Sequence, residues 1–457
     1  MTISETITNP QNPVESHRET EDDTPLESLR ERPYNVRDFW YPVVFLQDFL
    51  PDRPYGFSIY DESYVLFVNS AGELECLRDR CPHRSAKLSD GKLIDGKIEC
   101  LYHGWQFGKG GECLHIPQLS EGGTIPKAAC ARSFPVAVRQ GLVWIWLGNP
   151  QAANAEEIST LEVLETPGVV SSDYLVDLPY DRTYLIENVI DPAHVNISHD
   201  HSEPGVKKED AQPLEMEILE RSGRGIFTRY RGMRNPNDRW KYLDFVAQNL
   251  VHYRLSEGIP HFIFGLGLYS LPLGKGRCRL FVRRYSNAQN WQLKYKPRWM
   301  EHLRQSQVLE EDLPQIVGQQ EEVSRSGESL KSLYLPLKTS DALVVEYRKW
   351  LDEFGETLPF YEGYETSRDL SCASETVSLD RFSRHTQNCS SCSQTYHNLE
   401  MLKRGAIAVS IILAAVAIVL DDPRAEVAIV LVALASVAAA TLIQKLKTHF
   451  ERSYQRF

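Results

Sequence analysis

Two short motifs early in the chain combine cysteine with histidine. Cys81-x-His83 and Cys100-x-x-His103 present two thiols and two imidazoles on two separate segments. A [2Fe–2S] cluster of Rieske type takes this mixture, with two Cys on one iron and two His on the other. A Cys2His2 zinc site would use the same four residues. Zinc sites usually hold both cysteines in one Cys-x-x-Cys motif, so the repeated alternation of Cys and His favours the iron–sulfur cluster.

A second pair of histidines lies further along the chain. His194 and His199 follow a helix-like segment, and Pro192 provides a break at which the chain can bend. A non-haem Fe(II) that activates O₂ takes two His and one carboxylate on one face, which leaves positions open. His201 is an alternative to His199, and we prefer His199. The pair predicts a mononuclear iron site.

The third iron ligand must be a carboxylate from elsewhere, and Asp312 is the candidate. It lies in a segment, 299–317, whose apolar residues have helical spacing. Glu310 and Glu311 compete with it, but we expect only one of three neighbouring side chains on a helix to face inward. A solvated acidic helix face is the alternative interpretation of this segment.

A Cys-x-x-Cys motif near the C-terminus is the third cluster of reactive residues. Cys389 and Cys392 are flanked by His385 and His397. In a reducing compartment such a motif is a candidate redox-active dithiol or half of a zinc site, or it has no special chemistry. Other thiols lack a nearby partner at metal spacing and are expected to be ordinary buried cysteines: Cys76, Cys113 and Cys130.

Composition narrows the class of protein. The chain has 457 residues and a formal net charge of -12, which disfavours nucleic acid as a partner. Residues 1–35 are polar and acidic and predict a disordered leader. They have neither a secretory signal nor the Arg-rich, acid-poor composition of a transit peptide, which favours a bacterial protein in a reducing compartment.

Hydrophobic patterning predicts an α+β protein in several parts. Residues 64–68 and 73–77 should form a β-hairpin, and 141–148 a buried strand. Further antiparallel strands are expected at 261–269 and 279–285, where they would form a sheet with an apolar pocket face. The expected parts are an all-β Rieske domain (36–150), a linker (151–172), a catalytic mononuclear-iron domain (173–365), a linker with the Cys-x-x-Cys motif (366–400) and two transmembrane helices (401–445).

The C-terminal tail carries two nearly uncharged runs, 405–420 and 427–443, joined by an Asp-Asp-Pro-Arg turn. With flanking residues, each run approaches the length that spans a bilayer. Lys403 precedes the pair and Lys445 follows it, so positive charge at both outer ends places the catalytic part on the cytoplasmic side. A helical hairpin buried in a soluble core is the alternative.

These motifs together resemble the Rieske non-haem iron oxygenases. The terminal Cys-x-x-Cys motif followed by two apolar runs is similar to the pheophorbide a oxygenase branch, which includes protochlorophyllide-oxidising enzymes and a translocon-associated relative. The likeness covers residues 38–443. The motifs that carry it are Cys81-Pro-His-Arg, Cys100-Leu-Tyr-His-Gly-Trp-Gln-Phe and Glu187-Asn-x-x-Asp-x-x-His with a second His five residues on.

The resemblance implies roles for particular residues. Cys81, His83, Cys100 and His103 would hold the cluster, whereas the mononuclear Fe(II) would be held by the three ligands proposed above. Asp191 would connect His194 with the Rieske histidine of a neighbouring subunit, which implies a head-to-tail homotrimer.

The resemblance also implies partners and a substrate. Ferredoxin or a ferredoxin reductase would supply electrons, and O₂ would be the co-substrate. With the membrane anchor, the expected substrate is a lipophilic, chlorophyll-derived tetrapyrrole such as pheophorbide a, and the expected location is a cyanobacterial thylakoid or plasma membrane.

Two other functions compete with the oxygenase. A redox-sensing or translocation-associated Rieske protein without a dedicated tetrapyrrole substrate is suggested by Cys389 and Cys392. A Rieske electron-transfer protein of a cytochrome complex is disfavoured, because such proteins carry an extra disulfide-forming Cys in each cluster loop. Here Ala86 and Tyr102 occupy those neighbourhoods, and the apolar segments are C-terminal.

Overall fold

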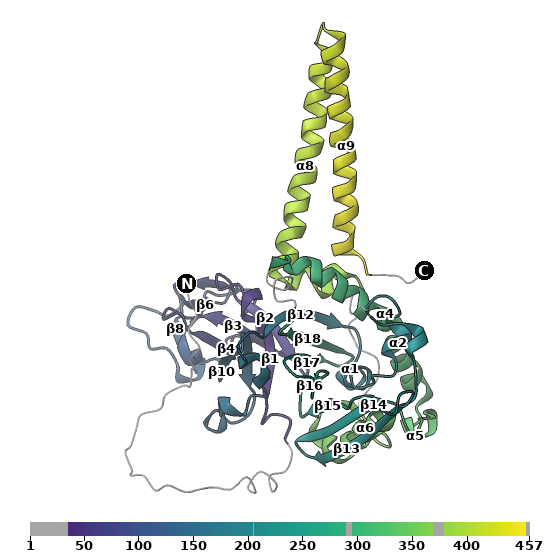
Figure 1. Ribbon diagram of the computed structural model, residues 1–457. Helices are drawn as coiled ribbons and strands as arrows, with labels where there is room; N and C mark the ends of the chain where they lie inside the picture. The colour runs from purple at the N-terminus through teal and green to yellow at the C-terminus, as the bar shows by residue number, and fades with distance from the viewer. Residues whose placement is uncertain (1–34, 204, 289–294, 369–378, 454–457) are drawn as a thin grey trace.

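The computed structural model describes residues 35–203, 205–288, 295–368 and 379–453. The expected leader therefore lies outside the described residues, apart from residue 35. Figure 1 shows a β-rich body from which two long helices extend on one side. The predicted α+β class is confirmed, and so is its order of a β-rich domain, a mixed domain and two apolar helices.

Three small antiparallel sheets form the N-terminal part of the body. The predicted hairpin at 64–77 is present, with Tyr64 paired to Arg78 and Val68 paired to Leu74. The predicted strand near 141–148 is also present, and all of its residues are buried. The sheets are, in spatial order, β2 (Tyr55–Ile59), β3 (Glu62–Val68), β4 (Leu74–Arg78) and β9 (Ser133–Phe134); β5 (Lys92–Ile94), β6 (Lys97–Glu99), β7 (Gln106–Phe107) and β8 (Cys113–His115); and β1 (Trp40–Phe45), β11 (Leu142–Trp146) and β10 (Val136–Arg139).

A seven-stranded antiparallel sheet forms the second part. Its two strands predicted from sequence pair with each other along most of their length, so that Phe264 lies opposite Ser286. Burial of alternate residues along β14 shows that one face of the sheet packs inward. The spatial order is β12 (Val170–Leu178), β18 (Arg277–Ser286), β17 (Phe264–Gly274), β16 (Leu250–Arg254), β15 (Lys241–Val246), β14 (Gly225–Gly232) and β13 (Leu214–Ser222).

The two expected domains share one hydrophobic core. Trp144 of β11 meets Tyr269 of β17 edge to face, with ring centroids 5.4 Å apart. The buried Arg283 of β18 pairs with Asp173 of the neighbouring strand at 2.8 Å and donates to the carbonyl of Gln140 at 2.7 Å, so a hydrogen bond also crosses the junction. The boundary between the parts is therefore a packed interface rather than a flexible joint.

The segment 151–172, expected as a linker, is folded against this core. It contains three short 3₁₀ turns, η5 (Pro150–Ala152), η6 (Ala155–Glu157) and η7 (Glu162–Glu165). Ile158 and Leu161 are both buried. Burial of these apolar residues fixes the path of the chain between the two sheets.

Helices cover the large sheet and carry the residues of interest. The helix expected at 299–317 is longer and runs from Arg298 to Ser326, with Pro314 inside it. The helices and short strands after β12 are α1 (Arg182–Val189), α2 (Val195–Ser198), η8 (Lys208–Asp210), α4 (Arg298–Ser326), α5 (Leu330–Leu333), α6 (Ala342–Phe354), η9 (Gly355–Thr357), β19 (Tyr361–Glu362), β20 (Ser367–Arg368), α7 (Arg381–Arg384) and η10 (Thr386–Asn388). The first 3₁₀ turns are η2 (Leu46–Asp48), η3 (Lys109–Gly111) and η4 (Lys127–Ala129).

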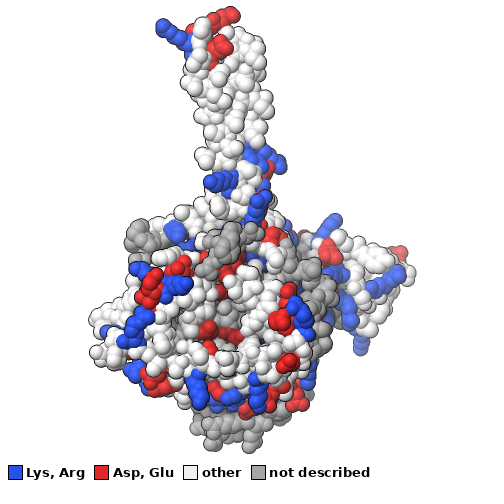
Figure 2. Space-filling model, turned by 90° about the vertical axis from the view of Figure 1, so that its right-hand side faces the viewer, with Lys and Arg blue, Asp and Glu red and all other residues white. Residues whose placement is uncertain are grey.

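The C-terminal helices α8 (Ser390–Ile418) and α9 (Pro423–Glu451) form an antiparallel pair of 29 residues each. By length and composition alone, both can cross a membrane. Figure 2 shows a column without charge between a charged base and a charged tip. Asp422 caps α9 by accepting a hydrogen bond from the backbone of Arg424. The helix α8 begins at Ser390, so the last part of the expected linker 366–400 is the first turns of this helix.

Candidate functional site

Two loops at the tip of the N-terminal part carry the Cys-His motifs. One loop joins β4 to β5, and the other joins β6 to β7. A backbone hydrogen bond of the same kind closes each loop. The amide of Cys81 donates to the carbonyl of Ala86 at 2.8 Å, and the amide of Cys100 donates to the carbonyl of Trp105 at 2.9 Å. Each cysteine therefore begins a closed turn, in which a later carbonyl returns to the amide of the cysteine.

The loops place sulfur inside and imidazole outside. Cys81 and Cys100 are buried, whereas His83 is exposed and His103 is partly exposed. The two imidazoles meet edge to face, with ring centroids 4.4 Å apart. Burial raises the pKa of the Cys81 thiol to about 11, so ionised sulfur there needs a positive charge beside it. This arrangement fits a [2Fe–2S] cluster whose two irons have different ligands.

Two further residues hold these histidines in place: Trp105, which belongs to the Cys100 motif, and Gln118, which was not identified from the sequence. The indole ring of Trp105 stacks on the imidazole of His83, with centroids 4.6 Å apart. Gln118 accepts a hydrogen bond from the Trp105 indole at 3.2 Å and donates to the carbonyl of His103 at 2.8 Å. Gln118 lies in a different loop, so only the fold brings it to this position.

The second His pair meets its expected carboxylate. His194 and His199 flank the single-turn helix α2, which starts just beyond the break at Pro192. Asp312 Oδ2 lies 3.6 Å from His194 Nε2 and 3.2 Å from His199 Nε2. One ligand atom from each of these side chains lies within 4.8 Å of the other two. Two imidazoles and one carboxylate on one side of a point fit an iron ion with open positions.

Further carboxylates face the outer nitrogens of both imidazoles. Glu311 Oε2 lies 3.1 Å from His199 Nδ1. Asp191 Oδ2 lies 3.5 Å from His194 Nδ1. A carboxylate at Nδ1 keeps the proton on that nitrogen and leaves Nε2 free to ligate a metal. Both rings are therefore held with Nε2 directed at Asp312.

The local electrostatics are those of a site that accepts a cation. Burial lowers the pKa of His194, but its interactions with Asp191 and Asp312 outweigh this and raise it to about 10. Burial raises the pKa of Asp312, yet its interactions with His194 and His199 hold that pKa well below the ordinary value. Negative charge is thus concentrated at the point where the metal would lie.

Three consecutive acids on α4 are all buried, which contradicts the expectation that only one of them faces inward. Glu310 pairs with Arg381 at 2.5 Å and with Arg384 at 3.0 Å. Glu311 faces His199, and Asp312 faces both site histidines. The expectation failed because α4 is covered on more than one side, by α2 and by the segment around α7.

His201 does not join the site. Its side chain is 72% exposed, and its Nε2 lies 3.5 Å from Asp200. Its backbone has a φ of 62°, which turns the chain away from the pair His194 and His199. The structure therefore places His199, and not its neighbour, beside Asp312.

A cavity of about 460 Å³ opens beside this site. Its wall combines the polar residues near the histidines with apolar residues from α4, α5 and the following loop. This mixture is typical of a binding pocket for a small molecule. The lining residues are Glu187, Asn188, Asp191, His194, Ser198, Asp312, Gln315, Ile316, Gln319, Leu333, Tyr334, Leu335, Pro336, Asp341 and Val344.

The Cys-x-x-Cys motif belongs to a second group of possible metal ligands. Cys389, Cys392 and His385 lie together with His302 of α4, and all four residues are buried. His397 is exposed and does not take part. His302 was not identified from the sequence, because it lies far from the motif along the chain. Cys130, expected to be buried, is exposed, whereas Cys76 and Cys113 are buried as expected.

The cluster loops and the second histidine pair lie far apart in one chain. Figure 1 places β6 and β8, beside the cluster loops, at one side of the body and α2 at the opposite side.

Two family models match the chain. The family model described as the Rieske [2Fe-2S] domain matches residues 39–135, and the model described as pheophorbide a oxygenase matches residues 236–329. The chain is 35% identical to protein TIC 55 of Arabidopsis thaliana, with 93% of this chain and 85% of that protein covered. It is 29% identical to pheophorbide a oxygenase of Oryza sativa, with 96% and 88% covered.

Solved structures have the same fold. Dicamba monooxygenase bound to dicamba superimposes with a TM-score of 0.58 at 24% identity, over 70% of this chain and 98% of that one. NdmA of Pseudomonas putida with caffeine superimposes with a TM-score of 0.56 at 22% identity, over 70% and 90%.

The relatives correct the expected location. TIC 55, pheophorbide a oxygenase and chlorophyllide a oxygenase are all described as chloroplastic proteins, from plants and from the alga Chlamydomonas reinhardtii. The expectation of a bacterial protein in a cyanobacterial thylakoid or plasma membrane is therefore wrong, since these relatives are chloroplast proteins. The wrong expectation came from the composition of the acidic leader, which differs from that of a transit peptide.

The identity to TIC 55 over nearly the whole chain establishes the family. The match to the Rieske model, over the part that carries the Cys-His motifs, and the match to the pheophorbide a oxygenase model, over a part that includes Asp312, agree with it. The expected [2Fe–2S] cluster and mononuclear iron are confirmed as the cofactors of this family. The chain belongs to the Rieske non-haem iron oxygenases, in the group of pheophorbide a oxygenase, and is an oxidoreductase.

Proposed function

We propose that this oxygenase is anchored in a membrane and oxidises a lipophilic, chlorophyll-derived tetrapyrrole such as pheophorbide a. Electrons come from ferredoxin or a ferredoxin reductase, and O₂ is the co-substrate. The observation that carries this proposal is the cavity beside His194 and Asp312, whose lining includes apolar residues of α4, α5 and the loop after α5.

The cluster ligands in this proposal are Cys81, His83, Cys100 and His103. Support comes from the two buried sulfurs and the two imidazoles at the surface, which suit a cluster that exchanges electrons with a partner. Imidazole ligands at the surface bring the electron path to the outside of the domain. Trp105 keeps the His83 ring in its orientation.

The mononuclear iron is held by His194, His199 and Asp312. Such an iron, with open positions, supplies the activation of O₂. Glu311 and Asp191 orient the two imidazoles, since each carboxylate faces a Nδ1 atom. The cavity wall binds the substrate and limits the access of water to the site.

Asp191 also provides the route by which electrons reach this site from outside the chain. Its side chain is 23% exposed and lies next to His194. The two sites of one chain lie on opposite sides of the body, so the donor is the Rieske histidine of a neighbouring chain. A head-to-tail homotrimer closes such contacts into a ring.

The membrane anchor consists of α8 and α9, with the Asp-Asp-Pro turn on the far side of the bilayer. The uncharged column between charged ends supports this role. An anchored enzyme meets substrates that partition into the bilayer. The exposed apolar loop after α5 forms the mouth of the cavity, where Leu335 is 96% exposed.

The domains in this proposal are the Rieske domain (36–150), the catalytic domain (173–365), the connecting segment (366–400) and the anchor (401–445). The helices α1 and α4 and the large sheet, apart from the start of β12 at Val170, fall within the catalytic range, which supports its boundaries.

Incubation of the full-length protein with pheophorbide a, reduced ferredoxin and ¹⁸O₂ tests the substrate. Mass spectrometry should show a product that contains the label. His194→Ala should abolish this product, while the matched variant His201→Ala should keep it, because His201 points away from the site. The substrate proposal fails if the wild-type protein leaves pheophorbide a unchanged while it oxidises another compound.

A second candidate is a redox-sensing or translocation-associated protein without a dedicated tetrapyrrole substrate. It is favoured by the higher identity to TIC 55, 35% against 29% for pheophorbide a oxygenase. A further relative, 26% identical, is described as a protochlorophyllide-dependent translocon component. For this function, His194→Ala should keep the cellular phenotype and Cys389→Ser should lose it, the reverse of what the oxygenase requires.

A further inference from the structure

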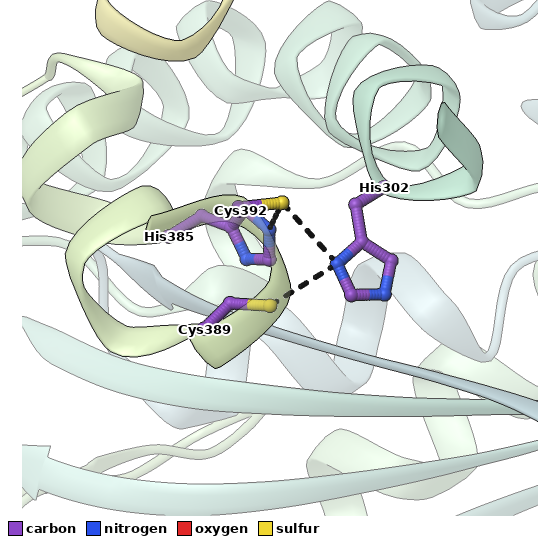
Figure 3. Close-up of side chains that lie close together, drawn as sticks. All are labelled: His302, His385, Cys389 and Cys392. Carbon is purple, nitrogen blue, oxygen red and sulfur yellow. Dashed lines mark hydrogen bonds between the residues drawn. The ribbon is translucent and has the colours of Figure 1, made fainter. Parts of the chain in front are cut away.

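Four buried side chains converge where the C-terminal hairpin joins the catalytic part. Figure 3 shows His302 projecting from one helix toward Cys389 and Cys392 at the start of another, and toward His385, which lies shortly before that start. The first helix is α4, and the second is α8. None of the four side chains is more than 1% exposed, and their ligand atoms all lie within 4.8 Å of one another.

Backbone carbonyls fix which nitrogen of each imidazole faces the group. His302 Nε2 lies 2.9 Å from the carbonyl oxygen of Asp173, and His385 Nδ1 lies 2.6 Å from that of Leu175. A carbonyl only accepts hydrogen bonds, so these two nitrogens carry the protons. The other nitrogen of each ring then has a free lone pair directed at the thiols, as in metal-binding histidines.

The distances match those of a tetrahedral metal site. His302 Nδ1 lies 3.4 Å from Cys389 Sγ and 3.5 Å from Cys392 Sγ. His385 Nε2 lies 3.2 Å from Cys392 Sγ. With Zn–S near 2.3 Å and Zn–N near 2.0–2.1 Å, a tetrahedral zinc site has S···N separations of about 3.6 Å. A small inward or outward movement of the side chains is all that coordination requires.

We propose that His302, His385, Cys389 and Cys392 bind a structural Zn²⁺ ion. Two sulfurs and two nitrogens are a common ligand set of structural zinc, and four protein ligands leave no position open for catalysis. Binding of Zn²⁺ releases the two thiol protons to solvent, so the site with two thiolates and two neutral imidazoles carries no net charge. Neutrality suits a location that water does not reach.

The ion would join the hairpin to the helix that carries Asp312. His302 lies near the start of α4, and Cys392 lies in the first turn of α8. The junction has a second connection, because Glu310 of α4 pairs with Arg381 just before α8. The zinc site therefore holds the base of the hairpin in a fixed position against the catalytic part.

Metal analysis of the full-length protein in detergent tests this proposal. The protein should be purified without a His-tag and dialysed, and its zinc and iron measured by mass spectrometry. We expect about one zinc per chain in the wild type and less than about a tenth of that in Cys389→Ser/Cys392→Ser. Iron should be unchanged in the variant, because these cysteines belong to neither iron site.

Two control variants separate this site from other zinc-binding residues. His397→Ala and Cys130→Ser change an exposed histidine and an exposed cysteine outside the group, and both should keep the zinc. Equal zinc in the wild type and the double variant would overturn the proposal. So would wild-type protein without zinc, with a Cys389–Cys392 disulfide or with iron in these positions.

X-ray absorption at the zinc edge of the wild-type protein keeps the test decisive if the double variant does not fold. We expect two sulfurs at about 2.3 Å and two nitrogens at about 2.0–2.1 Å. A shell of oxygen and nitrogen alone would mean that the zinc is bound elsewhere, and the proposal would be wrong.

Discussion

Glu311 Oε2 lies 3.1 Å from His199 Nδ1, and the opposite nitrogen of the same ring lies 3.2 Å from Asp312. Adjacent residues of one helix thus contact opposite edges of one imidazole. Ser202 also donates to Glu311, so the orienting carboxylate is itself held in place. The orientation of the iron ligands therefore depends on the residues that surround them.

Replacing the orienting carboxylate tests this arrangement. Glu311→Gln should lower the affinity of the protein for Fe(II) by about 10–100-fold, because the His199 ring loses its charged partner. The affinity is measured by titration of Fe(II) into iron-depleted protein. Glu321→Gln, at an exposed position of the same helix, should leave the affinity unchanged. Equal affinities in both variants would show that Glu311 does not orient the ligand.

Electron transfer between chains predicts complementation in mixed oligomers. His103→Ala removes a proposed cluster ligand and His194→Ala removes a proposed iron ligand, so each variant alone should be inactive. Co-expressed and purified as mixed oligomers, they should regain activity, since an intact cluster in one chain can serve an intact iron site in the next. Product formation by tagged heteromers is the measurement. If the heteromers are no more active than the separate variants, electron transfer between the chains of a trimer would be contradicted.

Asp191 is expected to be essential to that relay. Asp191→Asn keeps the size of the side chain and removes its charge, so the cluster content should stay near wild type, and the variant is assayed with excess Fe(II) because Asp191 also orients the iron ligand His194. Product formation should fall by about tenfold or more. A wild-type rate of cluster reoxidation in stopped-flow measurements of the variant would exclude a role for Asp191 in electron entry.

The apolar mouth of the cavity predicts an effect on substrate affinity. Leu335 is 96% exposed in the free protein, and its burial by the bound substrate would contribute about 1.5–3 kcal/mol, so the charge of Leu335→Asp at the entrance should raise KM for the tetrapyrrole by about tenfold or more. Leu379→Asp is the matched control, because Leu379 is an exposed leucine that does not line the cavity. If both variants have the wild-type KM, the substrate enters elsewhere.

A buried acid outside the cluster, iron and zinc sites predicts how stability depends on pH. Burial raises the pKa of Glu362 from 4.5 to about 7, and Arg348 offsets only part of this effect. Because the folded pKa lies above the unfolded one, folding favours the protonated carboxyl, and stability decreases as the pH rises from 4.5 through 7.

Glu362→Gln mimics the protonated carboxyl and tests this dependence. The variant should have a higher Tm than wild type at about pH 8, and the difference should narrow toward about pH 5. Glu356→Gln, at an exposed position nearby, should show no such trend. A difference in Tm that is independent of pH would mean that the Glu362 carboxyl does not titrate in this range.

The sequence predicts the parts of the sites that are local. The Cys81 and Cys100 motifs are recognisable because each loop contributes a Cys and a His within a few residues. His194 and His199 are recognisable for the same reason, and the strong periodicity around Asp312 identifies its helix.

Contacts between distant segments could not be predicted in this way. His302 reaches Cys389 only because α4 passes the start of α8, and no local pattern connects the two positions. The burial of Glu310 depends likewise on Arg381, which approaches from another segment. The shared core of the two main parts has the same origin, since it is formed by packing between sheets that are distant in sequence.

The central claim is that His194, His199 and Asp312 hold an iron that is distinct from the cluster. Mössbauer spectroscopy of ⁵⁷Fe-labelled wild-type protein and of Asp312→Ala tests it most directly. Wild-type protein should show the cluster signal together with a separate high-spin ferrous signal, and the variant should retain only the cluster signal. A ferrous signal of equal intensity in Asp312→Ala, or its absence from wild-type protein loaded with iron, would contradict the account.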